Sequence, residues 1–184
     1  MGLIKQARSN NGAKLVVVDP YRTQTAAKAD RHLMLRPGTD GALAAAVMHV
    51  LFRDNLADRD YLARYTDCPE RLEKHLESRT PQWAATITGL GVDEIEAFAA
   101  LYGSVPNSFL RVGYGFSRSR NGSANLHAVS CLPAVTGAWR HKGGGALQSS
   151  GGVFDLNRTL LDGLDVPQPK VRTLDMSRIG PVLT

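Results

Sequence analysis

Long apolar runs and an export signal are both missing from this 184-residue sequence. No apolar run approaches the roughly 20 residues that a bilayer span requires. The first ten residues, MGLIKQARSN, contain neither the apolar core nor the small-residue cleavage site of a signal peptide. These absences predict a cytoplasmic protein without a membrane-spanning segment.

The common metal and nucleophile motifs are also absent. The two cysteines, Cys68 and Cys131, belong to no CxxC or histidine-paired pattern, so we expect unpaired thiols rather than a disulfide or a metal site. The five histidines show no HxH or HExxH spacing, which argues against a histidine metal site. Neither a GxSxG motif nor a Walker loop is present. Residue chemistry alone therefore predicts a ligand-binding unit without a visible catalyst.

The composition that remains is typical of one soluble globular core. The sequence is 43% hydrophobic and 21% charged, and its length suits one sizeable core better than two domains. The net charge of +5 suits an anionic ligand, but the basic residues are spread along the chain and do not predict a nucleic-acid partner. One denser patch could hold a pyrophosphate or could simply be a solvated face. It comprises Arg111, Arg118, Arg120, Arg140, His141 and Lys142.

Residues 14–40 carry the strongest fold signal. The continuously apolar run at residues 15–18 is typical of a strand covered on both faces in a parallel α/β sheet. Pro20 ends this strand because proline has no N–H to donate. Asp19 would then lie at the carboxyl end of a buried strand, where open α/β sheets bind their ligands. The sequence RPGTD ends the stretch as a turn, so that Asp19 and Asp40 would flank one crevice.

Hydrophobic periodicity and turn residues predict the other elements. The predicted helices cover residues 3–8, 23–29, 41–55 (with Thr39 as its cap), 58–65, 69–77, 81–86, 92–102 and 121–138, and further strands cover 31–35 and 107–112. Pro133 should kink or break the last helix, and the glycines at 143–145 and 151–152 should form loops. The pattern predicts an α/β domain over residues 1–161. We expect a three-layer, Rossmann-like parallel sheet flanked by helices, incomplete as part of a larger fold, and an irregular excursion over residues 162–184.

Three candidate sites each have a structural alternative. A carboxylate can accept the paired N–H donors of a guanine edge or the hydroxyls of a ribose. Asp40 could instead only stabilise the first turn of a helix, an effect worth roughly 0.3–1 kcal/mol, and Asp19 could only form an Asx-turn before proline. GYGFSR, at residues 113–118, is not a GxGxxG fingerprint, so it is either a simple turn or a loop whose backbone approaches a ligand.

Several motifs, in this order, resemble the central cofactor-binding region of the molybdopterin oxidoreductases, the family of dimethyl sulfoxide reductase, formate dehydrogenase and periplasmic nitrate reductase. They are VVVDPYR followed by TQTAAKAD, RPGTDGAL opening a helix, GYGFSRSRNG, and LPAVTGAWRHKGGG. The resemblance covers about residues 3–145. It implies a fragment of a larger molybdenum or tungsten oxidoreductase that is inactive alone.

The resemblance also implies which residues bind the cofactor, a bis(molybdopterin guanine dinucleotide). The DPYR and PGTD turns would grip one guanosine end, with Asp40 reading the guanine, and residues 113–118 would pass the pterin near the metal. Tyr21 is inserted into the family's DPR pattern, so either Tyr21 or Arg22 would take the arginine position. The full implied set is Asp19, Pro20, Arg22, Gly38, Thr39, Asp40, Gly113, Tyr114, Gly115, Phe116 and Arg118.

Other parts of such an enzyme are implied to lie outside this chain. These are the iron-sulfur cysteines, the residue that ligates the metal and the carboxy-terminal domain. The implied partners are therefore the remaining domains of the parent oxidoreductase and electron-transfer subunits, and the parent could be cytoplasmic or periplasmic. Two alternatives stay open: a nicotinamide-dependent dehydrogenase domain, disfavoured by the missing GxGxxG, and a non-catalytic interaction module.

Overall fold

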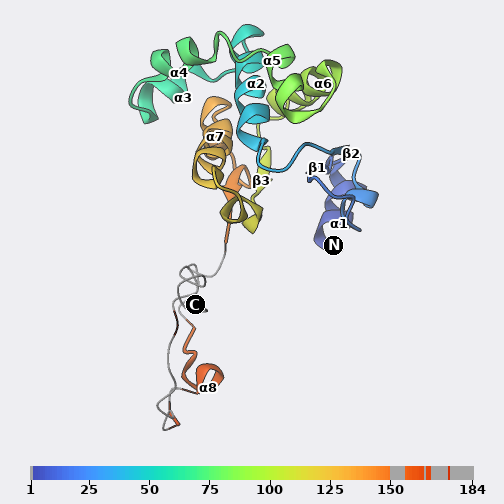
Figure 1. Cartoon of the computed structure of the whole chain (residues 1–184), viewed down its shortest axis with the longest axis vertical. Helices are drawn as coiled ribbons and strands as arrows, with labels where there is room; N and C mark the ends of the chain where they lie inside the picture. Colours follow the sequence, from blue (N-terminus) through green and yellow to red (C-terminus); the bar gives the residue numbers. More distant parts are fainter. Residues whose placement is uncertain (1, 150–155, 164, 167–173, 175–184) are drawn as a thin grey trace, which may run out of the picture. The chain divides into compact units, whose positions relative to one another are not determined.

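The computed structural model describes residues 2–149, 156–163, 165–166 and 174 (Figure 1). The chain divides into two units, Met1–Gln148 and Ser149–Thr184, and the second contains the short helix α8 (Thr159–Asp162). Gly151, Gly152 and most of residues 162–184 lie outside the described residues, so the predicted loop and excursion there stay predictions. The predicted domain boundary at residue 161 is likewise untested.

The first unit begins with a helix and a small parallel sheet. α1 (Gly2–Asn11) leads into β1 (Val16–Val18), which pairs in parallel with β2 (Arg31–Leu33). The predicted helix at residues 23–29 is only a short 3₁₀ turn, η1 (Ala26–Lys28), between these strands. Both strands therefore form as predicted, but each is shorter than the predicted range, 15–18 for the first and 31–35 for the second.

A second parallel sheet joins two segments that are distant in sequence. β3 (Phe109–Arg111) pairs with β4 (Gly145–Leu147), with Leu110 opposite Ala146. The prediction of a loop at residues 143–145 was wrong at Gly145, which begins β4. Glycines weaken a strand locally, but here β3 supplies the hydrogen-bonding partner.

The prediction that the first strand is covered on both faces was wrong. Val16 and Val17 are half-buried and Val18 is 38% exposed. The described residues form two separate two-stranded sheets rather than one larger sheet. The chain is thus an α/β protein with more helix than strand, and the three-layer Rossmann-like arrangement is not confirmed.

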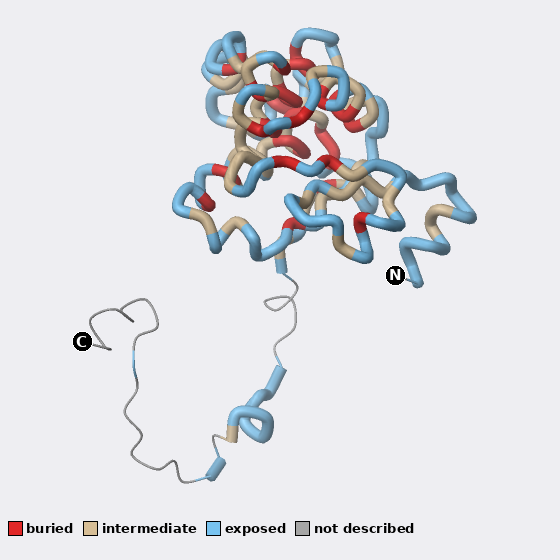
Figure 2. Tube along the Cα trace, turned by 45° about the vertical axis from the view of Figure 1, so that its right-hand side comes forward, coloured by how far each residue is buried: buried red, intermediate tan, exposed pale blue. Residues whose placement is uncertain are grey.

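The core is built around α2 (Asp40–Arg53), the helix with the clearest apolar pattern in the sequence. Val47, Val50 and Leu51 on this helix are fully buried, and burying each such side chain contributes roughly 1.5–3 kcal/mol. α2 packs against other helices on several sides, as Figure 1 shows. These are α4 (Pro69–Leu76), α5 (Pro81–Thr88), α6 (Val92–Gly103) and α7 (Gly122–Val135). The buried residues in Figure 2 gather among these helices.

Side-chain caps and glycines set the ends of the shorter helices. Asp58 caps α3 (Arg59–Tyr65) by accepting a hydrogen bond from the Tyr61 backbone N–H at 2.8 Å. Thr80 caps α5 in the same way, and the left-handed Gly89 ends it. The structure therefore extends the predicted helix at residues 81–86 to Thr88.

α7 contains Pro133 and ends shortly after it, at Val135, rather than at the predicted residue 138. Gly137 then adopts a left-handed conformation, with φ of 65°, and the 3₁₀ turn η3 (Ala138–Arg140) follows. Among the described helices, none is long and apolar enough to cross a membrane.

Candidate cofactor-binding site

The RPGTD turn, residues 36–40, connects β2 to α2 and is anchored at its first residue by α5. The Arg36 backbone N–H donates to the Thr88 carbonyl at 2.8 Å, and its guanidinium Nη1 donates to the Thr86 carbonyl at 3.0 Å. Both carbonyls lie in the last turn of α5, where a cation complements the negative end of the helix dipole. Gly38 turns the chain with φ of 78°, a conformation that favours glycine.

α7 holds the middle of this turn. The Gly38 carbonyl accepts hydrogen bonds from the side-chain amides of Asn121 at 3.0 Å and Asn125 at 2.9 Å. The Asn125 Oδ1 atom in turn accepts the Gly41 backbone N–H at 3.1 Å. Sequence reasoning missed both asparagines. No local signal distinguished them, because the same helical stretch also contains Ser123, His127 and Ser130. The burial of Asn125, which is only 5% exposed, depends on contacts with residues distant in sequence.

Thr39 stands at the N-cap position of α2, as predicted, but its side chain caps no backbone N–H. Its hydroxyl donates instead to the Arg36 carbonyl at 2.6 Å, which closes the turn on itself. The expectation of a Thr39 side-chain cap was therefore wrong. The Thr39 hydroxyl oxygen can still accept a hydrogen bond from a ligand.

Asp40 follows as the first residue of α2 and is half-buried. Burial raises the pKa of its carboxyl group above the ordinary aspartate value, its own backbone N–H partly offsets this, and the negative charge of Asp19 raises it further. Within the described part of the chain Asp40 forms no ion pair. A carboxylate that is partly desolvated and lacks a cation is therefore held in a fixed turn.

Asp19 lies close enough to Asp40 for their charges to interact. Its Oδ1 atom accepts the Tyr21 backbone N–H at 2.8 Å, which is the Asx-turn that the sequence left open as an alternative. Its other carboxylate oxygen accepts no hydrogen bond from the described residues. Pro20 and Arg22 beside it are exposed, and Tyr21 is 73% exposed. Either Tyr21 or Arg22 can reach a ligand here.

The GYGFSR segment forms the 3₁₀ turn η2 (Tyr114–Arg118) after β3. Gly113, Tyr114, Gly115 and Arg118 are exposed, whereas Phe116 is half-buried. The turn packs against the first residue of α7 so tightly that a Cβ atom on Gly122 would overlap the Phe116 carbonyl oxygen.

The two predicted cofactor segments therefore meet at the same helix end. The RPGTD turn is bonded to Asn121 and Asn125, and η2 packs on the adjoining Gly122. Ser119, just after η2, also lies against Gly38, 3.8 Å from where a Cβ on that glycine would be. The structure thus brings Gly38–Asp40 beside both Asp19 and the segment that follows η2.

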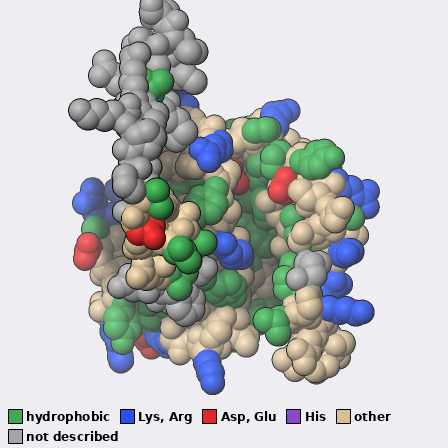
Figure 3. Space-filling view, turned by 90° about the horizontal axis from the view of Figure 1, so that it is seen from below, with side chains coloured by type: hydrophobic (Ala, Val, Ile, Leu, Met, Phe, Trp, Pro, Cys, Tyr) green, Lys and Arg blue, Asp and Glu red, His purple; other side chains and the backbone are tan. Residues whose placement is uncertain are grey.

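The six basic residues that were grouped by sequence do not act as one patch. Arg111 donates to the carbonyls of Val112 and Leu147, and Arg140 forms a 3.1 Å ion pair with Asp58. Arg118 and Arg120 are exposed and pair with no acidic residue in the part of the chain that the structure describes. Lysine and arginine side chains are also scattered over the face in Figure 3.

A comparison with known proteins decides the family. The profile of the molybdopterin oxidoreductases matches residues 1–178, nearly the whole chain. The chain belongs to the molybdopterin oxidoreductase family. The family predicted from the RPGTDGAL and TGAWRHKGGG motifs is thereby confirmed.

Individual members of the molybdopterin oxidoreductase family agree with this assignment. A probable oxidoreductase of Bacillus subtilis, YoaE, is 38% identical over 98% of this chain and 27% of its own length. A putative dimethyl sulfoxide reductase chain of Escherichia coli, YnfE, is 35% identical over 80% of this chain and 21% of its own length. The acetylene hydratase structure from Pelobacter acetylenicus superposes with a TM-score of 0.68 and 28% identity, covering 72% of this chain and 18% of that one. The chain therefore spans about a fifth to a quarter of these relatives.

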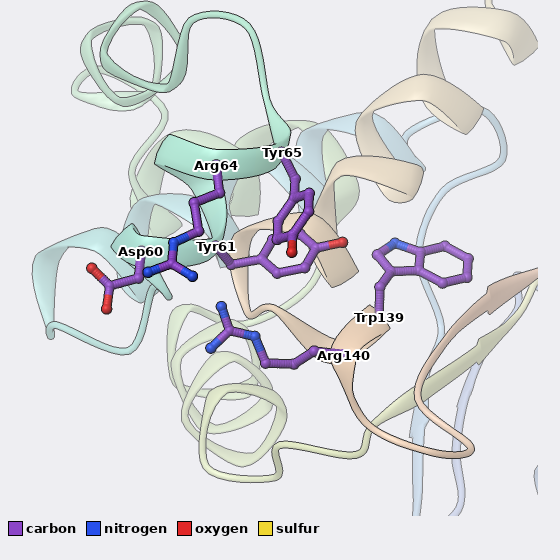
Figure 4. Close-up of a pocket in the computed structure, with 6 residues that line it drawn as sticks. All are labelled: Asp60, Tyr61, Arg64, Tyr65, Trp139 and Arg140. Carbon is purple, nitrogen blue, oxygen red and sulfur yellow. The ribbon is translucent and has the colours of Figure 1, made fainter.

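One cavity of this molybdopterin oxidoreductase segment lies apart from the candidate site (Figure 4). It has a volume of about 440 Å³ between α3 and η3 and contains none of the predicted cofactor residues. The rings of Tyr61 and Tyr65 are 4.7 Å apart, and the Arg140 guanidinium lies 5.3 Å from the centre of the Tyr61 ring. The lining residues are Asp60, Tyr61, Arg64, Tyr65, Trp139 and Arg140.

In the part of the chain that the structure describes, the thiols and other metal-binding groups form no cluster. Cys68 and Cys131 are free, as predicted, and burial raises the pKa of the Cys131 thiol. In the described ranges no three side chains of His, Cys, Asp or Glu are placed to share a metal ion.

Proposed function

We propose that this chain binds the guanosine end of a molybdopterin guanine dinucleotide in a molybdenum or tungsten oxidoreductase. The Asp40 carboxylate carries the proposal, because it is half-buried, has no cation partner among the described residues and sits in a turn fixed by neighbouring helices. Keeping such a charge partly desolvated costs free energy that a ligand donor can offset.

The chemistry of a carboxylate suits guanine in particular. Guanine presents two adjacent donors, N1–H and the exocyclic amino group, and a carboxylate offers two acceptor oxygens for them. Adenine presents an acceptor at N1, so the same carboxylate would face a lone pair. Asp40 therefore favours guanine over adenine.

The neighbouring groups suit the rest of the ligand. Asp19 has one carboxylate oxygen that accepts no hydrogen bond from the described residues and would accept a ribose hydroxyl, in the turn that also contains Pro20 and Arg22. Arg118 and Arg120, which are exposed and form no ion pair with the described residues, would bind the pyrophosphate oxygens, for which guanidinium groups are well shaped. The glycines of residues 113–115 would let the backbone pass close to the pterin.

The parent enzyme would complete the site. We propose that it holds a bis(molybdopterin guanine dinucleotide) and an iron-sulfur cluster outside this chain, completes the two small sheets into a three-layer Rossmann-like domain, and works with electron-transfer subunits. When bound, the cofactor metal supplies oxygen-atom or hydride transfer, and these residues only position the cofactor. This chain would be inactive alone, and its cytoplasmic location stays a prediction.

Calorimetric titration of the purified chain with GDP, and in parallel with ADP, tests the proposal. We expect guanine-selective binding that Asp40→Ala abolishes. Asp93→Ala is the matched control, because Asp93 is an exposed acidic residue in the first turn of α6.

Two other outcomes of this titration would favour one of the alternative functions. ADP binding in preference to GDP would favour the nicotinamide-dependent dehydrogenase alternative. Absence of nucleotide binding in both the parent chain and Asp40→Ala would contradict a preformed guanosine site and favour the interaction module.

A further inference from the structure

We propose that Asn125, with Asn121, is a positioning residue that holds the RPGTD turn against α7 by hydrogen bonds and thereby sets the selectivity of the site for guanine. The hydrogen bonds of these two side chains to Gly38 and Gly41 are called the latch below. The inference rests on the proposed function, because it gives these asparagines a role in the same site. Asn125 belongs to none of the motifs that predicted the site. Asn121 lies in the GYGFSRSRNG motif, but it is not among the predicted cofactor-binding residues. Both lie more than 80 positions from Gly38 in the sequence.

Asn125 is placed to hold the turn on both sides of Asp40. Its Nδ2 donates to the Gly38 carbonyl at 2.9 Å and its Oδ1 accepts the Gly41 N–H at 3.1 Å. Both ends of this amide are therefore satisfied, and the residue is only 5% exposed. A polar side chain this buried is costly unless it is hydrogen-bonded, so α7 tolerates Asn125 because of these contacts.

The Gly41 bond replaces a missing helix cap. The first N–H groups of any α-helix lack partners within the helix, and Thr39 at the N-cap of α2 provides no side-chain bond to them. Asn125 satisfies one of these N–H groups from a different helix. The start of α2, and with it Asp40, is fixed by α7 rather than by its own cap.

Asn121 strengthens the latch and connects it to η2. Its amide gives the Gly38 carbonyl a second donor at 3.0 Å, which fills both lone pairs of that oxygen. Gly122, the next residue, is the one on which η2 packs. The contact between Gly41 and Asn125 leaves no room for a side chain at position 41, because a Cβ on Gly41 would lie 2.6 Å from the Asn125 Oδ1 atom. The same turn of α7 thus positions the guanosine segment and the segment proposed to lie beside the pterin.

Two measurements on the 184-residue chain test the latch. Amide hydrogen exchange at Gly41, without ligand, reports whether the turn is held, and the ratio of GDP to ADP affinity reports whether Asp40 is positioned. The variants are Asn125→Ala, Asn125→Asp, which keeps an acceptor for Gly41 but loses the donor to Gly38, and Asn121→Ala. The control is Asn107→Ala, the same change at an exposed asparagine that bonds to no described residue.

We expect Asn125→Ala to speed Gly41 exchange and to lower GDP affinity about tenfold, because two hydrogen bonds are lost. ADP affinity should change much less, so the preference for guanine falls. Exchange at the buried amides of Val47 and Leu51 in α2 should stay as in the parent, which separates a loosened turn from an unfolded protein. Asn125→Asp should behave similarly, and Asn121→Ala should lower GDP affinity only about two- to fivefold.

Parent-like Gly41 exchange in Asn125→Ala would overturn the latch, as would an unchanged ratio of GDP to ADP affinity. If Asn125→Ala does not fold, Asn121→Ala decides the question, because Asn121 is exposed and its side chain bonds only to Gly38 among the described residues. Parent-like GDP affinity in that variant would then contradict the proposal. If the parent chain binds no GDP, the proposed function fails, and the Gly41 exchange rate still decides whether the latch exists.

Discussion

At the scale of single residues, the candidate site concentrates unfavourable electrostatics at Asp40. Its carboxylate is half-buried, lies near the like charge of Asp19 and has no cation among the described residues to compensate. Residues that fold a protein efficiently are not usually arranged in this way, and perturbed carboxylates are enriched at functional sites. The arrangement is understandable if a ligand supplies the missing donors.

Asp40→Asn should therefore make the unliganded chain slightly more stable at neutral pH. The folded protein holds the Asp40 proton more tightly than the unfolded chain does, so the ionised carboxylate destabilises the fold above the folded-state pKa. We expect the melting temperature at pH about 7 to rise by about 1–2 °C in the variant.

Calorimetric melting at several pH values checks this expectation. The difference between Asp40→Asn and the parent should narrow as the pH falls toward about 4, because the parent carboxyl then becomes neutral as well. A variant that is less stable than the parent at pH about 7 would show that the Asp40 charge only stabilises the start of α2.

At the scale of elements, α7 organises the site more than any strand does. It bonds to the RPGTD turn, supports η2 and packs along α2. The closest approach is at Gly122, where the Phe116 carbonyl occupies the space that a side chain would need. η2 can therefore occupy this position only because Gly122 has no side chain.

Gly122→Ala should destabilise the chain by about 2–3 kcal/mol, because the added methyl group must displace the backbone of η2. Gly115→Ala is the matched control within η2 itself, since a Cβ there would meet nothing within 4 Å. We expect the control to stay within about 0.5 kcal/mol of the parent in urea unfolding. Equal stability of the two variants would show that η2 can move away from α7 at little cost.

Some elements could be predicted from sequence because their signals are local. The apolar spacing of residues 41–55 predicted α2, and Pro81 predicted where α5 begins. β4 could not be predicted, because the glycines at residues 143–145 favour a loop and its strand conformation depends on pairing with β3. The latch was missed for the same reason, since Asn125 acquires its role from Gly38 and Gly41, which are distant in sequence.

At the scale of the whole molecule, the chain corresponds to only part of the length of its relatives. It covers 27% of the Bacillus subtilis relative and 18% of the acetylene hydratase chain. Our proposal that a parent enzyme adds further strands would explain why the sheets are small and why Val18 of β1 is 38% exposed. Cofactor affinity in that enzyme would therefore exceed what this chain achieves alone.

The most direct test of a guanosine site at Asp40 is amide hydrogen exchange along the whole chain, with and without saturating GDP. We predict that GDP protects backbone amides in residues 19–22, 36–41 and 113–118, where the Asp19 turn, the RPGTD turn and η2 lie. The aromatic cavity at Tyr61, Tyr65 and Trp139 should exchange equally in both states. Protection confined to that cavity, or no protection in residues 36–41, would contradict a guanosine site at Asp40.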